Sequence, residues 1–119
     1  MLNFHPMHEL SLALEVIRIA GSEADKIMAK SIQEIDIEVG DLSGVEADAF
    51  KSALELLAKD SVLSETRINI IRSAGRGRCK SCDHEFEMNY LTATCPKCQA
   101  FPSEISGGRE FRVLSLVIE

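Results

Sequence analysis

The chain has 119 residues, of which 45% are hydrophobic and 5% aromatic, and its formal net charge is −6. This length fits one compact unit with a small metal-stabilised appendage, and no run of about 18 apolar residues is present that could span a membrane. The excess of acidic residues lies in residues 1–74. Because a phosphate backbone is bound by clustered lysine and arginine, this balance argues against a nucleic-acid partner and is compatible with cations or a basic protein.

The first predicted element is a helix that begins near Met7, after a short lead that ends at Pro6. Apolar residues recur over residues 10–28 with the three- and four-residue spacing of one helix face. Gly21 and Ser22 interrupt this pattern. The helix either continues through them at a cost of about 1 kcal/mol or restarts with Ser22 as its N-cap.

Two strands and a second helix are predicted from the residues that follow. Isoleucine and valine alternate with charged residues over 35–39, which is the period of a half-buried strand, and residues 66–72 form another strand. Between them, apolar residues at helical spacing predict an amphipathic helix over residues 46–59. Ser43 and Glu46 have the spacing of a capping box at the start of this helix.

The last predicted strand covers residues 110–118, after a glycine turn at 107–108. Residues 113–118 are apolar on both faces, so we expect this strand to be well covered or central in the sheet. The order of the elements predicts an α+β fold, in which a small sheet of about three strands is covered by two helices.

All four cysteines lie in two Cys-x-x-Cys pairs, Cys79 with Cys82 and Cys95 with Cys98. Two such turns that face each other can place four thiolates at the corners of a tetrahedron, which is the coordination that Zn2+ takes in closed structural sites. The pattern is therefore typical of a zinc-ribbon module with a structural metal, because four cysteine ligands leave no open position. Two disulfides, a redox Cys-x-x-Cys and an iron–sulfur cluster are the alternatives.

The zinc module is expected to span residues 75–104, inserted into an α+β domain made of residues 1–74 and 105–119. Metal binding would supply most of its folding free energy, because the insert has little core of its own. The glycines within residues 75–77 and 107–108 are expected to loosen the chain and to act as hinges. No signal peptide precedes the chain, which predicts a cytoplasmic location, where disulfides are rare.

His8 and Glu9 stand at the start of the first helix. Imidazole and carboxylate ligands suit borderline divalent cations such as nickel, and nearby backbone nitrogens could complete a square-planar site. From the residues alone, a histidine–glutamate pair at a helix start is more typical of a solvent-exposed pair, in which the glutamate complements the helix dipole. The other histidines are His5, in the lead, and His84, within the zinc module, where four cysteines already fill the metal shell.

An ordered set of motifs resembles the HypA/HybF family of hydrogenase nickel-incorporation proteins over residues 7–119. The motifs are MHELS at 7–11, VGDLSGV at 39–45, the two cysteine pairs, and LSL at 114–116. The resemblance implies a nickel metallochaperone, not an enzyme, that binds Ni2+ at His8 and Glu9 and holds structural zinc at the four cysteines. It also implies that Glu46 lies where some family members place a carboxylate near the nickel.

The same resemblance implies the partners. These are a nickel-loading GTPase and the large subunit of nickel–iron hydrogenase, or urease in some organisms, and the chain would act as a monomer or a homodimer. One departure concerns the start, because the family's histidine follows the initiator methionine, whereas six residues precede Met7 here. Either translation begins at Met7 and supplies a free α-amine, or the site uses backbone amides with His8, Glu9 and His5.

Two other functions compete with this interpretation. A zinc-ribbon module that binds nucleic acid or regulates another protein would need basic residues around the cysteines, and Arg76, Arg78, Lys80 and Lys97 are there. The insert is neutral overall, however, and stacking aromatics are sparse. A metal-dependent hydrolase is the second alternative, but the sequence contains neither a His-x-x-x-His pair nor a serine nucleophile elbow.

Overall fold

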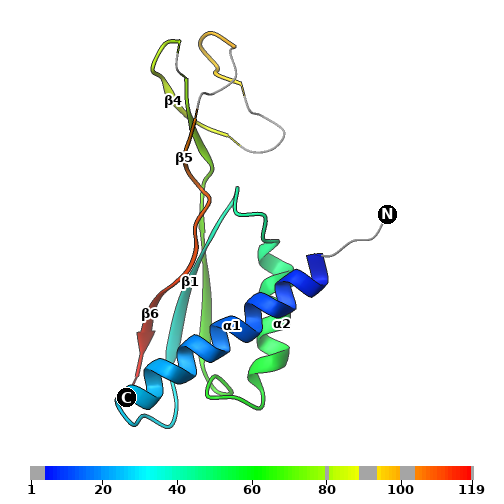
Figure 1. The fold of residues 1–119 in the computed structure, drawn as a ribbon, viewed down its shortest axis with the longest axis vertical. Helices are drawn as coiled ribbons and strands as arrows, with labels where there is room; N and C mark the ends of the chain where they lie inside the picture. Colours follow the sequence, from blue (N-terminus) through cyan, green and yellow to red (C-terminus); the bar gives the residue numbers. More distant parts are fainter. Residues whose placement is uncertain (1–4, 80, 89–93, 100–103, 119) are drawn as a thin grey trace.

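The computed structural model describes residues 5–79, 81–88, 94–99 and 104–118. The molecule is elongated, with principal extents of 54 × 36 × 18 Å. Two helices and a three-stranded sheet of the described chain lie at one end of the molecule, and a smaller three-stranded sheet lies at the other (Figure 1). No helix within the described ranges is long and apolar enough to cross a membrane.

Helix α1 (His5–Lys26) continues through Gly21 without a break, so the first of the two sequence alternatives is confirmed. The cost of a glycine inside a helix is about 1 kcal/mol. Burial offsets this cost, because Ala20 and Ala24 on either side of the glycine lie in the core. The helix ends before Met28, whose φ of 58° is the left-handed conformation that commonly terminates a helix.

Helix α2 (Ala47–Ala58) is shorter than predicted, and its N-cap is Glu46. The Glu46 carboxylate accepts the N–H of Ala49 at 2.6 Å, which satisfies one of the free N–H groups at the helix start. The predicted capping box is wrong. The hydroxyl of Ser43 accepts the N–H of Val45 at 3.1 Å instead, and so braces the loop that precedes the helix.

Strand β1 (Glu34–Gly40) is the centre of the main sheet, with β2 (Arg67–Ser73) parallel to it on one side and β6 (Phe111–Val117) antiparallel on the other. The prediction that the C-terminal strand is central or well covered is therefore wrong. Strand β6 bulges at Leu114, which pairs with no residue of β1 and is 44% exposed. An edge strand can accommodate such a bulge, whereas a central strand must pair on both sides.

Both helices cover one face of the main sheet, as predicted, and the hydrophobic core lies between the two layers (Figure 1). Alternation along β1 directs Ile35, Ile37 and Val39 into this core. The buried members of the core are Ala13, Val16, Ala20, Ala24, Ile32, Ile35, Ile37, Val39, Ala47, Phe50, Leu54, Ala58 and Leu63. The α+β fold class is confirmed.

In the small sheet, β3 (Arg76–Arg78) lies between β4 (Glu85–Glu87) and β5 (Glu104–Gly107), and both pairings are antiparallel. Its buried hydrophobic residues, within the described part, are Cys79, Phe86 and Cys95. Strand β5 crosses the domain boundary expected between residues 104 and 105. We propose that the cysteine module is a domain of its own, and that its second boundary follows β5.

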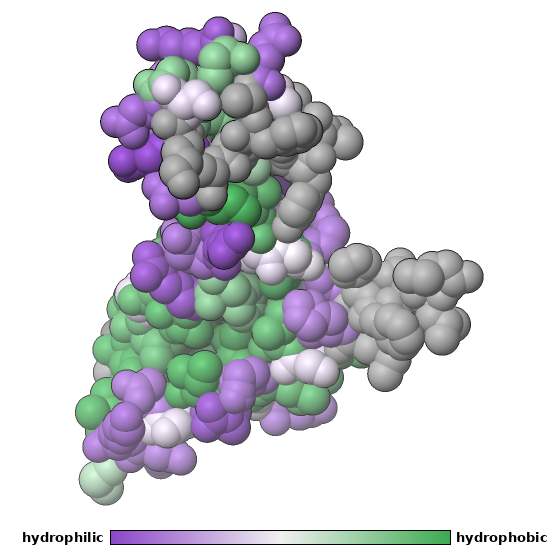
Figure 2. Space-filling model, turned by 45° about the horizontal axis from the view of Figure 1, so that its top comes forward, coloured by the Kyte–Doolittle hydropathy of each residue, from purple (hydrophilic) through white to green (hydrophobic). Residues whose placement is uncertain are grey.

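The surface differs between the two ends of the molecule. Figure 2 shows hydrophobic side chains gathered over the helix-and-sheet body, whereas hydrophilic side chains are prominent around the small sheet. The large exposed hydrophobic residues of the described chain all belong to the body. They are Leu10, Leu14, Ile27, Met28, Leu56, Ile71, Leu114 and Val117.

Candidate metal sites

The four cysteine sulfurs converge at one point of the small domain, within 4.8 Å of one another. The Sγ atoms of Cys79 and Cys98 are 3.2 Å apart, and those of Cys82 and Cys95 are 3.6 Å apart. A disulfide would require about 2.05 Å, and none of the four cysteines forms one. A zinc–sulfur bond of about 2.3 Å gives a tetrahedron with sulfur–sulfur edges of about 3.8 Å. The sulfurs therefore form a single cluster of the size that one metal ion needs.

The two Cys-x-x-Cys turns share a left-handed residue at the same position, while their backbone hydrogen bonds differ. Asp83 and Gln99 each directly follow the second cysteine of a pair, and their φ values are 57° and 60°. In the first turn the N–H of Cys79 donates to the carbonyl of His84 at 2.9 Å, and in the second the N–H of Gln99 donates to the carbonyl of Cys95 at 2.7 Å. Because a left-handed residue reverses the chain within a short distance, each cysteine pair lies on a tight turn.

The thiols influence one another's ionisation. The backbone N–H of Cys82, followed by the thiol of Cys98, lowers the pKa of Cys79 to about 7. The backbone N–H of His84 acts to lower the pKa of Cys82, but burial and the sulfurs of Cys95, Cys79 and Cys98 outweigh it and raise that pKa to about 12. One thiolate thus forms near neutral pH while its neighbour resists ionisation. A divalent cation among the sulfurs would supply the compensating charge, so the donor set fits a metal such as zinc.

At the other candidate site, Glu9 is completely buried, so the expectation of an exposed pair is wrong for this residue. Its Oε2 accepts the N–H of Glu46 at 3.0 Å. Its Oε1 is also buried and has no hydrogen-bond partner within the described chain. A carboxylate that loses its hydration without a full set of partners is destabilising. The Oε1 atom is therefore placed to accept a cation.

The neighbouring His8 remains accessible, because its side chain is 50% exposed. Its Nδ1 lies 3.8 Å from Oε2 of Glu9, so an exposed imidazole stands next to a buried carboxylate. Glu46 contributes its backbone N–H to Glu9, while its own carboxylate caps α2. The starts of α1 and α2 thus lie side by side here, and the three residues come together at this point.

The burial of Glu9 has a signal in the sequence that the sequence interpretation missed. Glu9 precedes the buried residues Ala13, Val16 and Ala20 at helical spacing, so it extends their stripe by one turn. Its contact with Glu46 has no such signal, because the two residues are 37 positions apart and meet only in the folded chain.

The imidazole of His84 does not join this arrangement. His84 is half-buried in the small domain, where its ring stacks on Phe86 with centroids 6.2 Å apart and an interplanar angle of 19°. His5 begins α1, and its side chain lies outside the described part of the structure.

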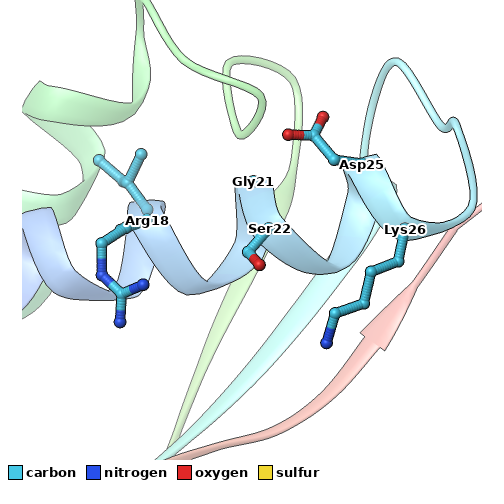
Figure 3. Close-up of a pocket in the computed structure, with 6 residues that line it drawn as sticks. Arg18, Gly21, Ser22, Asp25 and Lys26 are labelled. Atoms are coloured by element: carbon cyan, nitrogen blue, oxygen red, sulfur yellow. The ribbon is translucent and has the colours of Figure 1, made fainter.

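A surface depression runs along the outer side of α1 at Gly21, where the missing side chain leaves space (Figure 3). Its charged groups do not converge. In Figure 3 the side chain of Asp25 points away from those of Arg18 and Lys26, which extend from separate positions on the other side of the helix. Arg18 also pairs with Glu15 along the helix. The depression therefore offers no common site for a substrate and is separate from both candidate metal sites.

Comparison with known proteins places this arrangement in a family. A family model described as "Hydrogenase/urease nickel incorporation, metallochaperone, hypA" matches residues 7–118. The hydrogenase maturation factor HypA of Francisella philomiragia subsp. philomiragia is 38% identical over 111 residues, which cover 93% of this chain and 98% of that protein. The corresponding factor of Parabacteroides distasonis is 38% identical over 113 residues, which cover 95% and 98%.

Two solved structures show the same fold. The solution structure of the Ni metallochaperone HypA from Helicobacter pylori matches with a TM-score of 0.64 and 29% identity, over 92% of this chain and 96% of that one. A second structure, described as the solution structure of HypA protein, matches with a TM-score of 0.68 and 30% identity, over 95% and 97%. The chain therefore belongs to the HypA family of nickel metallochaperones for hydrogenase maturation.

Proposed function

We propose that this chain takes up Ni2+ at a site formed by His8 and Glu9 and hands it on during hydrogenase maturation. The observation that carries the proposal is the buried Glu9 carboxylate, whose Oε1 lacks a partner within the described chain, beside the half-exposed His8. A divalent cation would satisfy this oxygen and would use the imidazole as a second ligand, and both donor types suit nickel.

The two residues differ in a way that suits a carrier, which must also release its metal. The side chain of His8 is 50% exposed, so an acceptor protein can reach the ring and compete for the metal. Glu9 is held inside the body by the N–H of Glu46. We therefore assign His8 the role of the exchangeable ligand and Glu9 that of the fixed ligand. Glu46 is assigned a supporting role, because its carboxylate already accepts the N–H of Ala49.

The remaining nickel ligands depend on where the chain starts. In a chain that starts at Met7, the α-amine would stand one residue before His8 and could bind the metal. In the present sequence, α1 begins at His5, and the first N–H groups of a helix have no intrahelical partners. We therefore propose that nitrogen ligands come from the α-amine in a chain that starts at Met7, and from backbone amides at the start of α1 in the present sequence.

At the cysteine cluster we propose one structural Zn2+, held by Cys79, Cys82, Cys95 and Cys98. Four thiolates complete a tetrahedral shell, so no coordination position remains for a substrate. When bound, zinc would link the two cysteine turns. This link would stabilise a domain that has very little buried apolar surface. The chain as a whole would therefore transfer a metal ion, and we infer no enzymatic activity.

The proposed clients are the large subunit of nickel–iron hydrogenase and, as an alternative, urease, because the family description names hydrogenase and urease. A nickel-loading GTPase is proposed as a further partner on the family resemblance of the sequence alone. Nucleic acid fits this surface less well. Arg76 lies 3.3 Å from Glu85, and Arg78 lies 3.4 Å from Glu104, so acidic neighbours offset the basic residues next to the cysteines. Phosphate binding requires clustered basic groups.

The His8→Ala variant is expected to lose stoichiometric Ni2+ binding, while zinc content and helical circular dichroism stay as in the parent. The ring is half-exposed, so its removal leaves no cavity in the core. Isothermal titration with Ni2+ measures the first effect, and a zinc assay measures the second. His84→Ala is the matched control and should bind nickel like the parent. A form of the chain that starts at Met7 should bind Ni2+ more tightly than the form that starts at Met1, because its α-amine can bind the metal. Parent-like nickel binding by His8→Ala would rule out the proposed site.

The Glu9→Gln variant separates the charge of Glu9 from its structural contact. Glutamine keeps an oxygen that can accept the N–H of Glu46, but it lacks the negative charge that would attract a cation. We expect nickel affinity to fall at least about tenfold, which corresponds to roughly 1.4 kcal/mol. The resistance of the variant to urea unfolding should be equal to or higher than that of the parent, because a buried charge with incomplete hydrogen bonding lowers the stability of the fold.

Glu15→Gln, on the same helix but exposed, is the control for Glu9→Gln, and both affinity and stability should stay near the parent values. The assignment of Glu9 as a nickel ligand would fail if Glu9→Gln kept the parent's nickel affinity. In that case Glu9 would serve only to join the starts of α1 and α2.

A further inference from the structure

Three glycines from separate parts of the chain meet where the main sheet passes into the small sheet. They are Gly40 at the end of β1, Gly75 between β2 and β3, and Gly108 directly after β5. A methyl group added to Gly40 would overlap the carbonyl oxygen of Gly108 and would lie 2.9 Å from the backbone nitrogen of Glu110. One added to Gly75 would overlap the carbonyl oxygen of Met88. The backbones are therefore in direct contact, and we call this cluster of Gly40, Gly75 and Gly108 the glycine junction.

Hydrogen bonds and one side chain close the glycine junction. The N–H of Gly40 donates to the carbonyl of Glu110 at 2.6 Å, and the N–H of Leu42 donates to the carbonyl of Gly108 at 2.7 Å. The buried side chain of Leu42 fills the space over Gly75, where an added methyl group would lie 2.7 Å from its Cγ. Polar and apolar contacts thus hold the same three backbone segments together.

The carboxylate of Glu110 holds the turn at Gly108, whose N–H donates to it at 3.0 Å. The backbone N–H of Glu110, followed by that of Gly108, lowers the pKa of the Glu110 carboxyl group. Gly108 has a φ of 95°, a conformation that side chains rarely permit, so glycine is needed here for its conformation as well as for its size. The carboxylate therefore stabilises the turn at Gly108 from within the same segment.

These contacts contradict the expectation that the glycines at 75–77 and 107–108 loosen the chain. Gly75 and Gly108 are buried, and neither has room for a side chain. Glycine serves here to let three backbones approach closely, because a missing Cβ permits contact as well as freedom. The connection between the two sheets is therefore packed in the same way as a core.

We propose that the glycine junction is a rigid joint, which holds the cysteine domain at one orientation to the helix-and-sheet body. It also couples the domain to the loop between β1 and α2. Leu42 anchors this loop at the junction, and the hydrogen bond from Glu46 to Glu9 anchors its other end. The loop and the cysteine domain then move together as one unit. This inference does not depend on which metal the protein carries.

Residual dipolar couplings of backbone N–H groups in the full-length, metal-loaded protein provide the test. A rigid joint predicts that the couplings of both sheets and of the loop fit one alignment tensor. In the Gly40→Ala variant the new methyl group would overlap the backbone of Gly108 and crowd that of Glu110, so the two segments must separate. We expect the cysteine domain of this variant to require a second tensor of smaller magnitude.

Gly107→Ala is the matched control, because its methyl group would lie 3.8 Å from the Arg76 side chain, at an ordinary contact distance. It should keep one tensor. Leu42→Ala adds no atom and serves as the second variant if Gly40→Ala does not fold; it should also loosen the domain. The proposal is overturned if the parent protein already needs two tensors, since that result would reveal a free hinge. It is equally overturned if the loosening variants that fold keep one tensor.

Discussion

Replacement of Cys79 by alanine is expected to release the metal of the cysteine cluster and to unfold the small domain, while α1 and α2 persist. The Cys79 sulfur is buried and lies 3.2 Å from that of Cys98, so its removal leaves a three-ligand site open on one side. Structural zinc sites contribute an apparent binding free energy of about 10–16 kcal/mol at neutral pH. The few buried hydrophobic residues of this domain cannot replace that contribution, because two of them are themselves cysteines.

Metal content by mass spectrometry and amide spectra of the purified variant measure both effects. We expect less than one equivalent of zinc, loss of the dispersed signals of β3 and β4, and an unchanged helical circular dichroism signal. Ser81→Ala, which lies between Cys79 and Cys82 and is exposed, is the control and should match the parent in both measurements. A Cys79→Ala protein that held one zinc as firmly as the parent and kept an ordered small sheet would contradict the structural assignment. Iron in place of zinc in the parent would instead favour an iron–sulfur cluster.

The Phe50→Ala variant is expected to show the largest loss of stability in the helix-and-sheet body. Phe50 is fully buried on α2, and its ring meets that of Phe111 on β6 edge to face, with centroids 5.0 Å apart and an interplanar angle of 89°. It therefore joins the helix layer to an edge strand of the sheet. Phenylalanine-to-alanine changes in a core cost about 3–5 kcal/mol, which is a large part of the roughly 5–15 kcal/mol that stabilises a typical domain.

Urea unfolding followed by helical circular dichroism measures this loss, with the zinc content held constant so that the small domain does not contribute. Leu56→Ala is the control on the same helix. Its side chain is 62% exposed, so the change should stay within about 0.5 kcal/mol of the parent. If Phe50→Ala lost no more stability than Leu56→Ala, the body would not depend on the packing of α2 against β6.

The features that sequence reasoning predicted correctly are those with a local period or a fixed spacing. Alternation at Ile35, Ile37 and Val39 predicted β1, because a strand repeats every two residues. The helical repeat predicted α1 and α2. The two cysteine pairs predicted a single four-sulfur cluster, since each pair needs only a tight turn to present both thiols. In each case the information lies within a few neighbouring residues.

The features that the sequence interpretation missed depend on residues far apart in the chain. An apolar run at residues 113–118 does not reveal that β6 is an edge strand with a bulge, because its position depends on which strand it pairs with. Glu46 has the spacing for a capping box, but the folded loop uses it as the N-cap and turns its N–H towards Glu9. Neither outcome is encoded in a local period.

By itself, the sequence determined the two helices, the three strands of the main sheet, the cysteine cluster and the family to which the chain belongs, because each rests on the order and spacing of residues. It did not predict the short strands β3, β4 and β5. Only the tertiary structure decided that Glu9 is buried with one oxygen that has no hydrogen-bond partner among the described residues, and that Gly40, Gly75 and Gly108 touch. The physical reason is that burial and close approach arise when separate segments pack together. A glutamate at a helix start looks the same in the sequence whether it is exposed or buried, and so does a glycine in a connecting segment. Only the packing of the folded chain distinguishes the exposed residue from the buried one.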